Sequence, residues 1–149
     1  SIGKELFDYI RSVLPDGKTV LELGSGWSSE ELSKYYTVYS VEHDPEWVDK
    51  YETNYIYAPI VRGWYDLKPF KKGLPKVYDL ILGDGPTPAP RRLGFYHHLK
   101  LINTDVTIVF DDVDRSHMRE MLIQLAEQLG RTYEIRQSGK KQFGIIPAV

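Results

Sequence analysis

Cysteine is absent from the 149 residues of this chain, so disulfide bridges and thiolate metal sites are excluded. The sequence also lacks an apolar run of ~20 residues, the length of a membrane-spanning helix, and it lacks the core of a signal peptide. Its net charge is -2 and its basic residues are scattered, so no stripe of positive charge marks a nucleic-acid partner. These absences predict a cytoplasmic protein with no membrane contact and no nucleic-acid partner. The length fits one domain over residues 1–149.

What is present is an alternation of strand and helix patterns. Apolar residues at helical spacing near the start end at the turn Pro15-Asp16-Gly17, and a second helical stripe ends at Gly130. Strands are expected at 19–23, 37–41, 55–61, 77–82 and 106–110, with helices at 28–35, 44–51 and 91–101. A hairpin of strands 132–136 and 142–146 follows. This pattern predicts a three-layer αβα sandwich around a doubly wound, mostly parallel sheet, with an antiparallel strand from the terminal hairpin at its edge.

A glycine turn follows the first predicted strand. Gly24 and Gly26 allow a sharp turn and close approach of the backbone to a ligand, and Glu42 ends the second strand about twenty residues later. A carboxylate at that place accepts hydrogen bonds from ribose hydroxyls. In a doubly wound sheet the ligand lies beyond the carboxyl ends of the strands, so these residues indicate a nucleotide pocket there.

The segment Glu22-Leu23-Gly24-Ser25-Gly26 and the carboxylate of Glu42 resemble the cofactor motifs of class I S-adenosylmethionine-dependent methyltransferases. The resemblance extends over 19–146. It implies a Rossmann-like seven-stranded sheet with a reversed last strand, and S-adenosylmethionine as cofactor. It also implies that Glu22 orients the cofactor's ammonium group and that Glu42 holds its ribose. The cofactor-binding residues expected from the resemblance are Glu22, Gly24, Ser25, Gly26, Trp27, Ser28, Glu42, His43, Gly63, Trp64 and Asp84.

A nicotinamide dinucleotide is the alternative cofactor. Its fingerprint is GxGxxG, but Ser29 stands where the third glycine would be. A second alternative is a Rossmann-like domain that binds cofactor without catalysis.

The residues at the end of the fourth predicted strand indicate which kind of atom accepts the methyl group. They read Asp84-Gly85-Pro86-Thr87, whereas members of this superfamily that methylate exocyclic amines typically carry Asx-Pro-Pro-aromatic. We therefore expect O-methylation of a small-molecule or sugar-like acceptor, in a chain that could form a homo-oligomer.

Three aspartates at the predicted strand ends raise the question of a metal. Asp84, Asp111 and Asp112 resemble the carboxylates with which catechol-type O-methyltransferases hold a divalent cation such as Mg²⁺, although the strand-five pair there is usually Asp-Asn. Alternatively, Asp84 contacts cofactor or substrate and one of the pair caps the following helix.

Metal-free catalysis would need a base, for which His97, His98 and His117 are candidates. Asp84, Asp111 and His117 are the predicted catalytic residues. Arg91, Arg92 and Arg115 border the same mouth, where they could bind an anion or solvate the surface, and Arg115 could neutralise the aspartate pair.

Overall fold

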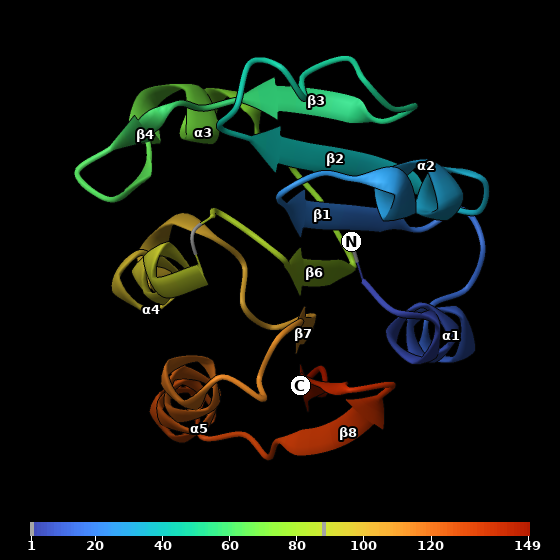
Figure 1. Cartoon of the computed structure of the whole chain (residues 1–149), viewed down its shortest axis with the longest axis vertical. Coiled ribbons are helices and arrows are strands. Elements are labelled where there is room, and N and C mark those ends of the chain that lie inside the picture. The colour runs from blue at the N-terminus through green and yellow to red at the C-terminus, as the bar shows by residue number, and fades with distance from the viewer. Residues whose placement is uncertain (1, 88) are drawn as a thin grey trace.

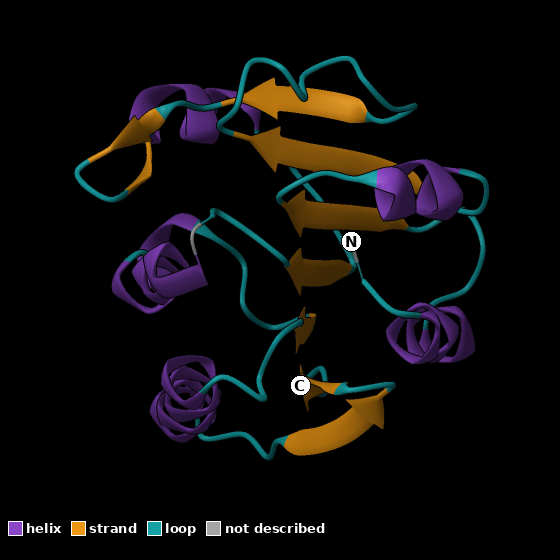
Figure 2. Ribbon diagram, in the orientation of Figure 1, coloured by secondary structure: helices purple, strands orange, loops and turns teal. Residues whose placement is uncertain are grey.

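The computed structural model describes residues 2–87 and 89–149. Strands and helices alternate along much of the chain (Figures 1 and 2). The helices are α1 (Lys4–Val13), α2 (Trp27–Ser33), α3 (Leu67–Gly73), α4 (Gly94–His97) and α5 (Ser116–Leu129), with 3₁₀ turns η1 (Ala89–Leu93) and η2 (Leu99–Leu101). The strands are β1 (Thr19–Leu23), β2 (Thr37–Glu42), β3 (Asn54–Tyr57), β4 (Ile60–Val61), β5 (Trp64–Tyr65), β6 (Leu80–Gly83), β7 (Thr107–Phe110), β8 (Glu134–Ser138) and β9 (Lys141–Ile146).

Seven strands form one sheet in the order β3-β2-β1-β6-β7-β9-β8. All neighbouring pairs from β3 to β7 are parallel, and β9 is antiparallel to both β7 and β8. The predicted mostly parallel sheet with a reversed last strand is therefore confirmed. The reversed strand lies inside the sheet between β7 and β8, while β8 forms the edge. Strand order reverses between β1 and β6, which is where a ligand crevice is expected.

The helices cover both faces of the sheet, with α1 and α2 on one side and α3, α4 and α5 on the other (Figure 1). Side chains on a strand alternate between the faces. In β6, Leu80 and Leu82 join the apolar cluster beneath α1 and α2, whereas Ile81 joins the cluster beneath α3 to α5. The central parallel strands β1, β6 and β7 are buried on both faces, which explains why they read as nearly continuous apolar runs.

Residues 44–51, predicted as a helix, form turns instead. Asp44 accepts a hydrogen bond from the amide of Glu46, and the amides of Trp47 and Lys50 bond to carbonyls three residues earlier. Asp49 then adopts a φ of 65°. A left-handed residue ends helical propagation, so this segment remains a loop.

Two further predicted elements are broken in the structure. The strand expected at 55–61 ends at Tyr57, and after Pro59 the short β4 pairs with β5 in a separate hairpin. Proline lacks the amide that the ladder requires. The helix expected at 91–101 is divided among η1, α4 and η2. Among the described residues, none of the helices combines the length and the apolar character needed to cross a membrane.

Candidate functional site

A cavity of about 280 Å³ lies at the carboxyl ends of β1, β2, β6 and β7, where the sheet order reverses. The first residue after each of the strands β1, β6 and β7 is still hydrogen-bonded to the neighbouring strand through its backbone amide. The amide of Gly24 donates to the carbonyl of Val41, that of Asp84 to Leu23, and that of Asp111 to Gly83. These bonds fix the start of each site loop. The cavity is lined by Gly24, Ser25, Glu42, His43, Asp44, Trp47, Asp84, Gly85, Pro86, Thr87, Arg92, Asp112 and Lys141.

The floor of the cavity is formed by two glycine loops in close contact. Gly24 has a φ of 94°, and a Cβ built on it would lie 3.0 Å from the carbonyl oxygen of Asp84. A Cβ on Gly85 would lie 2.8 Å from the Tyr65 hydroxyl and 2.9 Å from the Cα of Gly24. Both positions therefore require glycine, because any side chain would separate the loops.

Glu42 is a fixed acceptor at one end of the cavity. It is only 5% exposed, its Oε1 accepts a hydrogen bond of 2.6 Å from the Ser25 hydroxyl, and its Oε2 accepts bonds from the amides of His43 and Asp44. The Nδ1 of His43 lies 3.5 Å from the same Oε2. The carboxylate is thus held in place at the cavity wall before any ligand arrives.

Glu22 lies in β1 beneath the glycine turn and does not line the cavity. Its Oε1 accepts hydrogen bonds from the hydroxyls of Ser29 at 2.5 Å and Ser40 at 2.7 Å, and Ser29 also accepts a bond from the amide of Gly26. Burial raises the pKa of Glu22 to about 8. The hydroxyl bonds oppose this shift but do not overcome it, because a carboxylate is costly in an apolar environment. In this position Glu22 connects the turn to α2 and β2.

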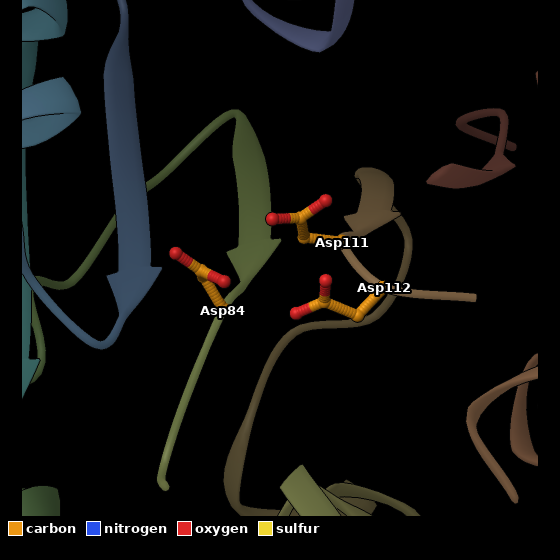
Figure 3. Close-up of side chains that lie close together, drawn as sticks. All are labelled: Asp84, Asp111 and Asp112. Atoms are coloured by element: carbon orange, nitrogen blue, oxygen red, sulfur yellow. The ribbon is translucent and has the colours of Figure 1, made fainter. Parts of the chain in front are cut away.

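Three carboxyl groups cluster at the other end of the cavity, where Asp84 and Asp112 line it and Asp111 is buried behind them. Figure 3 shows Asp84, on the loop after β6, beside Asp111 and Asp112 from the segment after β7. One oxygen from each lies within 4.8 Å of the others. Asp111 is 1% exposed, and Asp112 adopts a φ of 61°, a left-handed conformation that aspartate tolerates. The sequence prediction that these three side chains meet is confirmed by this arrangement.

Two cationic side chains are paired with these carboxylates. Arg92, 6% exposed, places Nη1 2.7 Å from Oδ2 of Asp112 and Nη2 3.5 Å from Oδ1 of Asp84. Lys141 places Nζ 2.8 Å from Oδ2 of Asp111 and 3.4 Å from Oδ1 of Asp112. Four of the six carboxylate oxygens therefore face a side-chain cation.

The pKa values follow this pairing. Burial and the nearby Asp111 raise the pKa of Asp84 to about 6. Burial also acts to raise the pKa of Asp112, but the bond from Arg92 and the charge of Lys141 outweigh it and lower that pKa. For Lys141, burial acts to lower the pKa and the carboxylates of Asp111 and Asp112 outweigh it. The pairs thus keep Asp112 ionised and Lys141 protonated.

Several residues expected at the site lie elsewhere. Gly26 and Ser28 begin α2 outside the cavity, and Trp27 is 59% exposed in a separate apolar groove with Ile2 and Phe7. On the other face, Gly63 turns the β4–β5 hairpin, and the buried Trp64 stacks on His98 with ring centroids 4.3 Å apart.

The three histidines considered as bases, and Arg115, also lie away from the cavity. His97 and His117 line a different pocket, next to Leu93 and Glu120. Arg115 is exposed before α5, and Arg92 and Lys141 pair with the aspartates instead.

The sequence interpretation did not identify Lys141 or Trp47 as cavity residues. Trp47 was placed in a helix. A signal for Lys141 existed in the reversed last strand, because the amino end of a reversed strand lies at the carboxyl ends of its parallel neighbours.

No protein-family model matches the chain, and a comparison with curated proteins gives no match. Solved structures do match. The Mtq2–Trm112 complex of E. cuniculi, responsible for methylation of the termination factor eRF1, is 18% identical, covering 98% of this chain and 94% of that one, with a TM-score of 0.60. A Plasmodium falciparum protein assigned as a ribosomal RNA methyltransferase is 15% identical, with coverages of 97% and 93% and a TM-score of 0.59.

The MycE methyltransferase of the mycinamycin biosynthetic pathway, solved with Mg and S-adenosylhomocysteine, is 15% identical. The match covers 97% of this chain and 45% of MycE, with a TM-score of 0.57. Further matches include other methyltransferases. This chain therefore has the fold of the class I methyltransferases, as the sequence resemblance implied.

The expectation of a small-molecule partner and no nucleic acid is corrected by these comparisons. Proteins of this fold include an assigned ribosomal RNA methyltransferase and a methyltransferase in complex with Trm112 that acts on a protein. Net charge and the lack of a basic stripe do not select the acceptor, because the fold supports acceptors of several classes.

Proposed function

We propose that this chain is an S-adenosylmethionine-dependent methyltransferase. The observation that carries the proposal is Glu42, a buried carboxylate held by three hydrogen bonds beside the Gly24 turn at the reversal point of the sheet. A fixed acceptor next to a close-packed backbone turn suits a ribose and the amino-acid part of the cofactor. His43 and Trp47 line the same end of the cavity, where they would border the adenine.

For Glu22, Gly26, Trp27, Ser28, Gly63 and Trp64 we propose indirect roles, because they lie outside the cavity. Glu22 positions the turn through Ser29, which also binds the amide of Gly26. Trp64 packs against Tyr65, whose hydroxyl lies against Gly85. These contacts keep the two glycine loops at the separation that the cofactor needs.

We further propose oxygen as the methyl-accepting atom. The bound cofactor would supply an electrophilic methyl group and leave as S-adenosylhomocysteine. In the transfer the sulfur–carbon bond breaks, a carbon–oxygen bond forms, and the hydroxyl proton needs an acceptor. Asp84 lines the cavity and receives that proton in this proposal. The tip Asp84-Gly85-Pro86-Thr87 lacks the second proline and the aromatic side chain typical of sites for exocyclic amines.

Calorimetry tests the cofactor assignment. Glu42→Ala is expected to weaken the binding of S-adenosylhomocysteine about 100-fold. The reason is that two hydrogen bonds from the ribose hydroxyls to a charged carboxylate contribute roughly 3 kcal/mol or more. Glu42→Gln, which keeps the shape, should weaken it less. Glu46→Ala removes an exposed carboxylate nearby and serves as the matched control. Equal affinity in the Glu42→Ala protein, or binding of NAD in place of S-adenosylhomocysteine, would contradict the assignment.

Transfer from S-adenosylmethionine carrying a labelled methyl group tests catalysis separately. The wild-type protein is incubated with RNA, protein and low-molecular-weight fractions of a cell extract, with Glu42→Ala as the blank. Label above the blank in one fraction supports the proposal and identifies the acceptor class. Cofactor binding without label in any fraction would favour a non-catalytic domain.

A further inference from the structure

The resemblance to catechol-type enzymes implies a divalent cation among Asp84, Asp111 and Asp112, and the donor set can be compared with that requirement. Mg²⁺ and Ca²⁺ bind carboxylate oxygens directly, at about 2.0 to 2.6 Å. Here both oxygens of Asp112 and one oxygen each of Asp84 and Asp111 face the nitrogens of Arg92 or Lys141. An ion among these oxygens would therefore lie next to two positive side chains.

The charges of the paired side chains also argue against a divalent cation at this cluster. Three carboxylates surround one guanidinium and one ammonium group, so the cluster is close to neutral without an ion. Repulsion between a divalent ion and two monovalent cations a few ångströms away is strong where the dielectric constant is low. The residues present do not fit a resident divalent cation while both cations remain in place.

The positions of the two cations indicate what they do. Arg92 comes from η1 and is buried, so its guanidinium is fixed between the segments after β6 and β7. Lys141 begins β9 and lines the cavity beside Asp112. Its side chain is 37% exposed, so it meets the cavity, whereas Asp111 behind it is buried.

We infer that Lys141 and Arg92 take the place of a divalent cation in this site, with Lys141 as the charge that faces the methyl acceptor. The inference deepens the proposed function and rests on it only in assigning this end of the cavity to the acceptor. The ammonium group pairs with the buried Asp111, lies beside Asp112 and meets the cavity. Lys141 is therefore a positioning residue, which sets the charge and geometry of the aspartates.

Binding of Mn²⁺ tests this inference without any methyl transfer. Free Mn²⁺ is measured by electron paramagnetic resonance in titrations of the wild-type protein, Lys141→Met and Lys140→Met, each with and without S-adenosylhomocysteine. Lys140→Met removes the adjacent exposed lysine and is the matched control. We expect the wild-type and Lys140→Met proteins to leave Mn²⁺ free. Lys141→Met should bind one equivalent at least tenfold more tightly, with a Kd near or below about 0.1 mM, as for carboxylate sites of moderate strength.

A second variant shows where the ion binds. Adding Asp84→Ala to Lys141→Met should abolish the gained affinity, because alanine offers no ligand oxygen in place of that carboxylate. Circular dichroism checks folding, and Lys141→Gln, which keeps a polar group at the site, replaces Lys141→Met if that protein does not fold.

Two results would overturn the inference. One is tight Mn²⁺ binding by the wild-type protein, because the ion would then coexist with Lys141. The other is no gain of affinity in Lys141→Met or Lys141→Gln. Neither result bears on S-adenosylhomocysteine binding at Glu42, so failure here is separate from failure of the proposed function.

Discussion

Replacing Glu22 with glutamine is expected to remove a pH dependence from the stability of the fold. Burial raises the pKa of Glu22 from its ordinary value of 4.5 to about 8 in the folded protein. Between these two values the folded state keeps a proton that the unfolded chain has lost. The contribution of Glu22 to stability is therefore fully present below the ordinary pKa and is lost as the pH rises through the folded pKa.

The size of the effect follows from the shift. Each unit of pKa difference corresponds to about 1.4 kcal/mol, so the free energy of unfolding should fall by up to about 5 kcal/mol across this range through Glu22 alone. Glutamine cannot ionise, and its carbonyl oxygen can accept the bonds from Ser29 and Ser40 that Oε1 of Glu22 accepts now. Glu22→Gln should thus match the wild-type protein near pH 5 and exceed its stability near pH 8.

Urea unfolding between about pH 5 and pH 8.5 measures the free energy of unfolding of both proteins. Asp84 also makes stability depend on pH, but it is present in both proteins, so its contribution is removed when the two free energies are subtracted. Glu127→Gln, on the exposed side of α5, is the matched control and should follow the wild-type curve. Parallel curves for Glu22→Gln and the wild-type protein would refute the reasoning, since they would mean that Glu22 ionises as easily when folded as when unfolded.

Two further substitutions test the packing that holds the site. Gly85→Ala places a methyl group 2.8 Å from the Tyr65 hydroxyl and 2.9 Å from the Cα of Gly24, so we expect a loss of about 1–3 kcal/mol of stability and weaker binding of S-adenosylhomocysteine. An unchanged melting temperature and affinity would show that the loops separate at no cost. Leu125→Ala, at a fully buried position of α5, should cost about 2–5 kcal/mol, whereas Ile123→Ala, 36% exposed on the same helix, should cost less than about 1 kcal/mol. Equal losses in urea unfolding would contradict the assigned faces of α5.

The sheet was predictable because burial on both faces leaves its mark in the sequence. β1, β2 and β7 are short apolar runs bounded by polar or turn residues, so their positions agree with the prediction to within about two residues. The segment 44–51 was mistaken for a helix because Asp44-Pro45 is a good helix start. The left-handed Asp49 that ends the turn has no local sequence signature.

Part of the site was also predictable. Glu42 and Asp84 follow apolar strands, and parallel strands bring their carboxyl ends to one edge, so their convergence follows from topology. The pairing of Arg92 with Asp112 did not follow, because it depends on how η1 packs after a loop rich in proline. Trp27 directly follows the glycine motif yet faces away from the cavity, because side-chain direction on α2 depends on where the helix begins.

The position of Lys141 shows how the reversed strand can determine the chemistry of the site. In a fully parallel sheet, only residues that follow strands reach the ligand edge. β9 runs the other way, with Gly144 opposite Phe110, so its first residue lies level with the segment that follows β7. The amide of Val113 donates to the carbonyl of Gln142 at 2.9 Å, which fixes that register beside the aspartates. A shift of one residue in this register would turn Lys141 to the opposite face of the sheet and leave Asp111 buried without its cation. The terminal hairpin is therefore part of the site as well as part of the fold.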